Sequence, residues 1–207
     1  MPWNDCIALT KDLILSGAAI TGAIVAVKGL GTWQHQLKGK TEYDLSRRLL
    51  VSVFKYRDAI RGVRNPAMFP YEMPQPPVDK LKTMNQDQVH FYGIAEAYQA
   101  RWSKVQDERV CLYADLLEAE AIWGVELKDT FKILYDLEHE LFTYIRRELE
   151  LMNPDVNSGK KDAIDRAQQK SRDIMYGDFG DEDDEFWKEF LVGIESIEKY
   201  LKPKLSY

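Results

Sequence analysis

An uncharged apolar run lies near the start of the chain, from Leu13 to Val27. Continuing past Lys28 to Trp33 gives 21 residues, and a helix of that length extends about 31 Å, enough to span the hydrocarbon core of a bilayer. Trp3 and Trp33 bracket the segment as interfacial residues do, and Lys28 lies close enough to its end for the ammonium group to reach the headgroups. We therefore expect residues 1–33 to form an N-terminal transmembrane anchor.

Two other interpretations start from the uncharged length of 15 residues, which also suits a buried core helix or a signal peptide. A cleaved signal peptide is disfavoured because the preceding residues include Asp5 and Asp12 and lack a positively charged region. Lys11 is the sole basic residue before the segment, whereas five follow it closely: Lys28, Lys38, Lys40, Arg47 and Arg48. The positive-inside rule then predicts an N-terminus outside the membrane and a cytoplasmic remainder.

Small residues recur every four positions within the predicted anchor, at Ala18, Gly22 and Ala26. This spacing places them on one stripe of a helix, where two copies could bring their backbones close together. The stripe predicts self-association in the membrane. The alternative is that Gly and Ala are simply frequent in membrane helices.

A basic juxtamembrane helix is predicted at residues 34–64. The sequence Thr41-Glu42-Tyr43-Asp44 resembles a capping box, and apolar residues follow at helical spacing. Its apolar stripe contains Leu45, Leu49, Val53, Tyr56, Ile60 and Val63. Its basic residues are Arg47, Arg48, Lys55, Arg57, Arg61 and Arg64. Lys38, Lys40, Arg47 and Arg48 lie nearest the membrane exit, so we expect them to contact anionic lipid headgroups, with a solvated face as the alternative.

Prolines interrupt the helical pattern at residues 65–84, which we interpret as a proline-rich linker, with packing against the rest of the protein left open. Helical periodicity returns from Gln86 to Trp123 and again from Glu126 to Met152, separated by Gly124. So short a turn makes the two helices antiparallel neighbours in a hairpin. Residues 85–207 are thus expected to contain the hairpin and C-terminal helices, packed with residues 41–64 as one bundle.

The C-terminal part contains two further helical patterns. Residues 157–176 are rich in charged residues with few apolar anchors, so we expect an exposed helix with little packing to hold it. The acidic stretch at residues 177–185 precedes an amphipathic helix with apolar residues Phe186, Phe190, Ile194, Ile197 and Leu201. No alternating strand pattern occurs, so the sequence predicts an all-α fold: a transmembrane helix followed by an antiparallel bundle built on the hairpin.

Charge and cysteine content narrow the classes of function. A net charge of -6 argues against a nucleic-acid binder, since neutralising phosphates needs an excess of Lys and Arg. Cys6 and Cys111 lie far apart in different settings, so no disulfide framework is expected. Their surroundings also lack metal-ligand spacing, and no Ser, Cys or His is arranged as a nucleophile. We expect no cofactor and no catalytic residue.

The one arrangement resembling a metal site is the pair Asp87-x-x-His90 and Asp136-x-x-His139. Residues three apart share a helix face, and di-metal bundles use two Glu-x-x-His motifs. Asp replaces Glu in both, and the hairpin would place Asp136 opposite the region near residue 112, far from His90. These four residues are therefore weak candidates for metal ligands.

The stretch from Gly29 to Pro66, reading GLGTWQHQLKGKTEYDLSRRLLVSVFKYRDAIRGVRNP, resembles the start of small uncharacterised bacterial proteins with one N-terminal membrane span and a helical cytoplasmic body. The resemblance implies a location in the bacterial inner membrane, and it implies no activity.

Three functions fit these features. The first is a membrane-tethered, non-enzymatic adaptor or scaffold that binds a protein partner, favoured if the hairpin keeps exposed apolar patches once the core is filled. The second is a membrane effector, in a stress or phage-defence setting, that self-associates through the small-residue stripe. The third is a metal-binding helical bundle.

Overall fold

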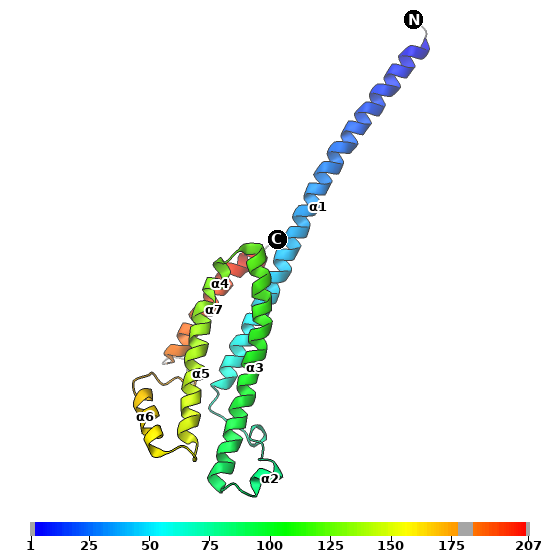
Figure 1. Ribbon diagram of the computed structural model, residues 1–207. Coiled ribbons are helices and arrows are strands. Elements are labelled where there is room, and N and C mark those ends of the chain that lie inside the picture. The colour runs from blue at the N-terminus through cyan, green and yellow to red at the C-terminus, as the bar shows by residue number, and fades with distance from the viewer. Residues whose placement is uncertain (1–2, 178–183, 206–207) are drawn as a thin grey trace. The chain divides into compact units, whose positions relative to one another are not determined.

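The computed structural model describes residues 3–177 and 184–205, and it describes side-chain surroundings for residues 15–18, 20–177 and 184–205. Every regular element in these ranges is helical, without a strand (Figure 1). The predicted all-α class is therefore confirmed.

Helix α1 (Trp3–Val63) is continuous through both the apolar segment and the basic segment. Thr41, expected to cap a new helix, instead lies inside α1, where its hydroxyl donates to the carbonyl oxygen of Leu37 at 3.0 Å. The predicted helix start at Thr41 is therefore wrong. The physical reason is that a threonine hydroxyl can bond either the N–H groups of a following helix or the carbonyl one turn earlier, and no proline or turn precedes Thr41 to select the first.

The chain divides into two compact units between Asp44 and Leu45. The first contains α1 up to Asp44, and the second comprises residues Leu45–Leu205. In the second unit the predicted apolar stripe of α1 is buried, namely Leu45, Leu49, Val53, Tyr56, Ile60 and Val63. The periodicity prediction is confirmed for this part of α1.

Helix α3 (Gln86–Trp123) has the predicted bounds. Asn85 accepts a hydrogen bond from the backbone N–H of Gln88, and the Gln88 side chain accepts one from the Asn85 N–H, both at 2.9 Å. The helix ends at Gly124, whose φ of +81° lies in the region that glycine adopts readily. A reciprocal cap and a glycine stop thus fix both ends of α3.

The expected single helix from Glu126 to Met152 is divided into α4 (Glu126–Thr130) and α5 (Lys132–Met152). At the break the Phe131 N–H bonds the Lys128 carbonyl three residues back, and the Phe131 side chain is fully buried. The tighter turn directs this ring into the core. Apolar spacing alone continues across such a turn, so it could not indicate the break.

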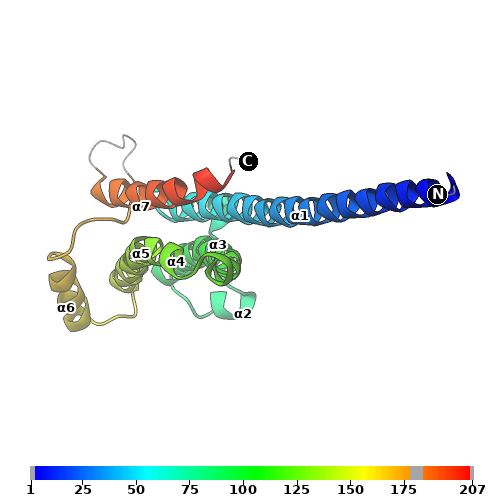
Figure 2. The same cartoon turned by 90° about the horizontal axis from the view of Figure 1, so that it is seen from above.

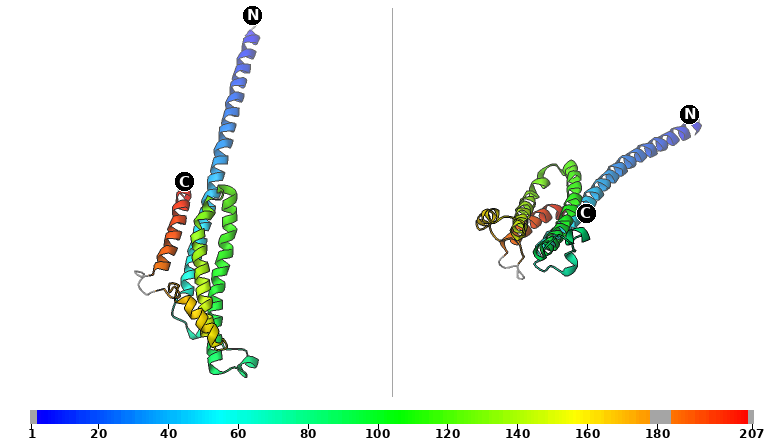
Figure 3. Two further views of the ribbon diagram at one scale, coloured as in Figure 1. Left: turned by 60° about the vertical axis from the view of Figure 1, so that its left-hand side comes forward. Right: turned by 60° about the horizontal axis from the view of Figure 1, so that its bottom comes forward.

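Helices α3 and α5 lie side by side in Figures 1 and 3. Contacts proceed in opposite directions along the two helices, and the start of α3 contacts Asp155 in the segment just after α5. The pairs are Gln88 with Asp155 at 2.7 Å, Trp102 with Phe142 at a ring separation of 4.9 Å, and Arg109 with Glu138 at 2.9 Å. The order of these contacts is the one expected for an antiparallel pair, and the hairpin itself stays a prediction.

Helix α7 (Glu185–Leu201) packs closely on α5 and is followed by the 3-10 helix η2 (Lys202–Leu205). Gly193 is at the closest approach, since a Cβ added there would lie 2.7 Å from Leu134 Cδ2. All the apolar residues expected on this helix are buried. Helix α6 (Ser158–Gln168) contacts α5 from another side (Figure 2).

The proline-rich segment packs against α3 and contains the short helices η1 (Pro70–Glu72) and α2 (Val78–Leu81). Arg101 of α3 is buried and donates to the carbonyl oxygens of Asn65 and Ala67 at 2.7 and 2.6 Å. The same guanidinium binds the Glu72 carboxylate at 2.9 and 3.0 Å. A charged side chain therefore holds a segment whose prolines remove backbone donors.

The segment that follows α6 is held more firmly than expected. Ile174 and Met175 are buried in the core, and Arg172 forms ion pairs with Glu140 and Glu189 at 2.8 and 2.9 Å. The expectation of little packing across residues 157–176 is wrong for this second half. Irregular backbone has no periodic apolar pattern, so its core residues left no signal in the sequence.

Candidate functional site

The exposed apolar surface of α1 is the main candidate functional site. Leu15, Ile24, Val25 and Val27 are each more than half exposed. At about 100° per residue, Leu15 and Ile24 lie on opposite sides of the helix, and Val25 and Val27 lie on the two flanks between them. An 18-residue window of this helix is apolar enough to cross a membrane, and 0% of it is buried among the described residues.

Two threonine hydroxyls of this surface are satisfied within the helix. The hydroxyl of Thr21 donates to the Gly17 carbonyl at 2.8 Å, and that of Thr32 donates to the Lys28 carbonyl at 3.0 Å. An unpaired hydroxyl is costly in an apolar medium. These internal hydrogen bonds make the segment compatible with lipid.

The predicted self-association stripe lies on the same surface. Ala18, Gly22 and Ala26 are exposed, and a Cβ at Gly22 would have nothing within 4 Å. The stripe is thus accessible to another helix, and its pairing stays a prediction. The side chains of five residues near the start of α1 lie outside the described part of the structure: Trp3, Asp5, Cys6, Lys11 and Asp12. The interfacial role expected of Trp3 therefore stays a prediction.

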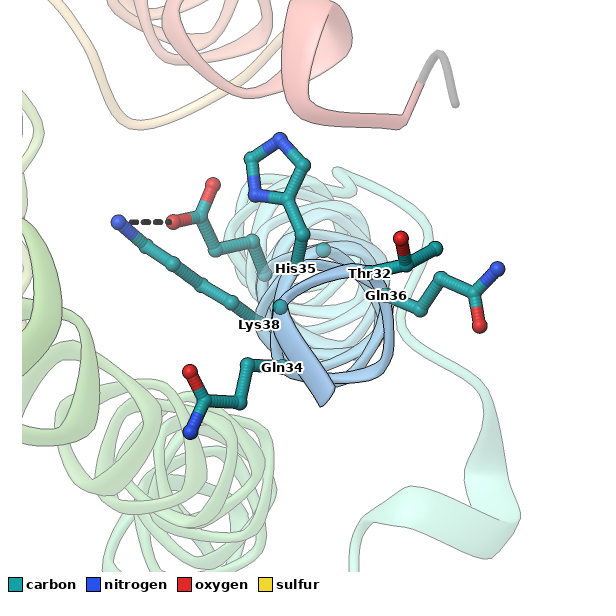
Figure 4. Close-up of a pocket in the computed structure, with 8 residues that line it drawn as sticks. Thr32, Gln34, His35, Gln36 and Lys38 are labelled. Carbon is teal, nitrogen blue, oxygen red and sulfur yellow. Dashed lines mark ion pairs between the residues drawn. The ribbon is translucent and has the colours of Figure 1, made fainter. Parts of the chain in front are cut away.

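Farther along α1, the turns from Gly31 to Glu42 bear polar side chains in several directions (Figure 4). The labelled residues are Thr32, Gln34, His35, Gln36 and Lys38. Lys38 forms an ion pair with Glu42 at 3.9 Å, and both Lys38 and Lys40 are exposed. These residues all come from one helix, which is convex, so by themselves they provide a surface for contact and no enclosed catalytic site.

The other two predicted lipid-binding residues differ in their surroundings. Arg47 is exposed, whereas Arg48 forms ion pairs with Asp115 at 3.2 Å and with Glu118. Contact of Arg48 with anionic lipid would therefore compete with two carboxylates of α3. The expectation of lipid contact is better suited to Lys38, Lys40 and Arg47.

Arg64, counted with the exposed basic face in the sequence, is buried. Its guanidinium binds both carboxylate oxygens of Asp184 at 2.8 and 3.0 Å and donates to the carbonyl oxygens of Ile174 and Tyr176 at 2.9 and 3.0 Å. Asp184 also caps α7 by accepting from the Trp187 N–H at 2.9 Å. Arg64 therefore joins three segments of the second unit and has no lipid-facing role.

A second buried polar group lies between α1, α3 and α5. The Tyr56 hydroxyl donates to Glu138 at 2.6 Å, and Arg109 donates to the other oxygen of that carboxylate at 2.9 Å. Burial, together with the charge of Glu138, raises the pKa of Tyr56 above its ordinary value. Burial raises the pKa of Tyr135, whose ring lies beneath Arg109, to about 12. Both tyrosines are neutral at pH 7, so this group acts as a structural hydrogen-bond network and supplies no nucleophile.

The structure keeps the two Asp–His pairs, the weak candidates for metal ligands, far apart from each other. Because Arg109 contacts Glu138, the pair Asp136 and His139 lies beside residue 109 of α3. His90 is 19 residues earlier on α3, about 28 Å away along the helix, and Asp87 lies farther still. Among the described residues no group of three or more His, Cys, Asp or Glu side chains is placed to hold a metal ion.

No protein-family model, curated protein or solved structure matches this chain. The residues that sequence reasoning missed are the buried charges Arg64, Arg101 and Glu138. Each occupies a helix position that polarity alone assigns to solvent. The signal in the sequence was Tyr56, which has the spacing of the neighbouring buried apolar residues, so that its hydroxyl needs a buried polar partner such as Glu138.

Proposed function

We propose that the chain is a non-enzymatic helical adaptor or scaffold, tethered to a membrane by residues 13–33 and carrying a cytoplasmic body that binds a protein partner. The observation that carries the proposal is the apolar segment of α1, exposed on every side.

The distribution of apolar residues round α1 favours lipid as the surroundings of this segment. A partner helix or a protein core covers one stripe of an amphipathic helix, about 100° wide, and leaves a polar face. From Leu15 to Trp33 the exposed apolar residues occupy all sides, and Lys28 is the one charge. A bilayer surrounds a helix completely, so it satisfies this pattern.

We further propose that α3 and α5 form a long antiparallel hairpin and that α7 and residues 45–63 of α1 complete a bundle on it. Support comes from the antiparallel register of the α3–α5 contacts and from the Tyr56–Glu138 hydrogen bond. The close approach of α7 to α5 at Gly193 adds the fourth member. A rigid bundle of this kind would present its outer helix faces to a partner.

The adaptor role is supported by an apolar stripe that α3 keeps on its outer face after the core is filled. Val110, Tyr113 and Leu117 are exposed at 70%, 50% and 49%. Their spacing of three and four residues places them on one face, which is the pattern by which helices dock on partner proteins. Exposed apolar surface of this kind is the feature that favours an adaptor over an enzyme.

Labelling of Cys111 tests topology together with tethering. This thiol is exposed on α3, and Cys6→Ser leaves it as the sole cysteine. The proposal predicts that an impermeant maleimide labels Cys111 in inverted membrane vesicles and leaves it unlabelled in intact spheroplasts. Equal labelling in spheroplasts would overturn the cytoplasmic assignment.

Photo-crosslinking tests the adaptor role itself. A photoreactive residue at Leu117 should yield one discrete crosslinked partner in cells, and the added change Val110→Asp should abolish it by placing a charge in the stripe. The same probe at Lys161, on α6, is the matched control and should yield no such product. Identical products at both positions would show that the stripe has no specific partner.

A self-associating membrane effector is the second candidate, favoured by the accessibility of the stripe around Gly22. Gly22→Leu would block close helix approach while raising hydropathy, so insertion should persist and dimer crosslinking should fall. Gly17→Leu is the control, because Gly17 is also open and lies about 140° round the helix from Gly22. Growth inhibition on expression that Gly22→Leu relieves and Gly17→Leu does not would select this function over the adaptor.

A further inference from the structure

The contact between α6 and α5 contains an incomplete hydrogen-bond pair. Gln168, at the end of α6, is 8% exposed, and its amide nitrogen donates to Oε1 of Glu148 on α5. The Gln168 Oε1 atom is buried and has no hydrogen-bond partner among the described residues. A buried acceptor without a donor is unusual and calls for a physical explanation.

Protonation of Glu148 would provide the missing donor. An ionised carboxylate only accepts hydrogen bonds, whereas a carboxylic acid also has one O–H to donate. A carboxylic acid and a primary amide can form two parallel hydrogen bonds, with the amide N–H donating to the carboxyl oxygen and the carboxyl O–H donating to the amide oxygen. The structure already contains the first bond, and Gln168 Oε1 is the acceptor for the second.

The groups round Glu148 favour its neutral form. Burial comes first, followed by the charges of Asp173 and Asp165; together they outweigh the Gln168 hydrogen bond, which acts in the opposite direction, and raise the pKa of Glu148 above its ordinary value. Two tyrosines complete the surroundings: Tyr144 donates to Asp173 at 3.2 Å, and Tyr98 of α3 is buried. The pKa of each tyrosine is raised, chiefly by burial, so both are neutral and add no charge beside Glu148.

Two basic side chains of the surrounding segments are engaged with other carboxylates. Lys160 of α6 forms its ion pair with Glu150 at 3.1 Å. Arg172 binds Glu140 and Glu189 at 2.8 and 2.9 Å. The described groups that shift the pKa of Glu148 also include no basic side chain, so a proton is the means of neutralising Glu148 that these contacts favour.

We infer that Glu148 and Gln168 form a proton-dependent latch, in which the carboxyl–amide pair holds α6 on α5 while Glu148 is protonated and weakens as Glu148 ionises. The direction of the pH dependence of docking follows from the linkage between docking and proton binding. Docking raises the affinity of Glu148 for its proton, so docking is strongest below the ordinary pKa and is lost as pH rises through the raised pKa. Within that interval the docking constant falls up to about tenfold per pH unit.

Hydrogen exchange of the full-length chain in detergent, corrected for intrinsic rates, measures this docking at about pH 5 and about pH 8. The backbone amides of α6 should be protected more strongly at the lower pH, because the raised pKa of Glu148 favours the docked state there. Glu148→Gln imitates the protonated side chain and should keep the stronger protection at both values. Amides of α7 report whether each variant is folded.

Two matched variants complete the test. Glu150→Gln removes a neighbouring carboxylate that already has Lys160 as its partner, so the pH dependence should persist. Gln168→Leu removes the amide and should leave α6 weakly protected at both pH values. The inference is overturned if wild-type protection is independent of pH, or if Glu148→Gln loses protection at both. Recovery of protection at the higher pH on addition of calcium would also overturn it, by assigning these carboxylates to a cation.

Discussion

Replacement of Arg64 by methionine should strongly destabilise the second unit of the protein, residues Leu45–Leu205. The Arg64 and Asp184 side chains are only 3% and 7% exposed. The methionine side chain would fill a similar volume without the charge and leave the Asp184 carboxylate buried. Within the described part of the chain, the donor that remains for it is the Trp187 N–H. The carbonyl oxygens of Ile174 and Tyr176 would lose their guanidinium donor as well.

The expected loss follows from the cost of a buried, unpaired charge. Removing one partner of a buried ion pair costs about 3 to 5 kcal/mol of unfolding free energy, a large part of the stability of a typical domain. Urea denaturation in detergent, followed by circular dichroism, measures the change. Arg57→Met is the control: its partner Asp58 is largely exposed, so the expected change is within about 0.5 kcal/mol.

A double variant separates the charge from the packing. Arg64→Met combined with Asp184→Asn removes the buried negative charge and should recover part of the lost stability. A loss below about 1 kcal/mol for Arg64→Met, or no recovery in the double variant, would refute the account of this ion pair as a buried clamp.

Two further changes test the packing of the second unit. Gly193→Val should lower the free energy of unfolding by about 1 to 3 kcal/mol, because its Cβ would contact Leu134 Cδ2 at 2.7 Å. Gly62→Val, in open space, should not be destabilising. Tyr56→Phe should cost about 1.5 to 3 kcal/mol by removing a donor to buried Glu138. Exposed Tyr113→Phe should cost almost nothing, and equal losses at the two tyrosines would contradict the buried network.

Regular apolar spacing made much of the fold predictable. The buried stripe of α1 from Leu45 to Val63 and the apolar face of α7 follow directly from helical periodicity. The bounds of α3 follow from the cap at Asn85 and from Gly124. These features are local, so a single sequence contains the information that defines them.

Features that depend on distant contacts were not predictable in this way. Arg64 and Arg101 resemble solvated side chains until Asp184 and Glu72 are brought to them from 120 and 29 residues away. The burial of Ile174 was not predictable either, because it lies in an irregular segment that has no apolar periodicity. Charge pairing across a fold is set by tertiary structure, and local propensity gives no indication of it.

The candidate site was predictable to a different extent. The apolar segment of α1 was evident from composition and length, and its exposure on all sides came from the structure. The outer stripe of α3 was not identified, because Val110 and Leu117 follow the same spacing as core residues such as Leu112 and Leu116. Only the packed structure shows which of two apolar faces is covered.

Carbonate extraction of membranes from expressing cells tests membrane tethering, by comparing the full-length chain with a chain that begins at Thr41. The account predicts that the full-length protein stays in the membrane pellet at its full mass, and that the shorter chain is soluble and helical. A full-length protein that is freely soluble, or that is recovered shortened and soluble after cleavage beyond the apolar segment, would contradict membrane tethering and the adaptor function that depends on it.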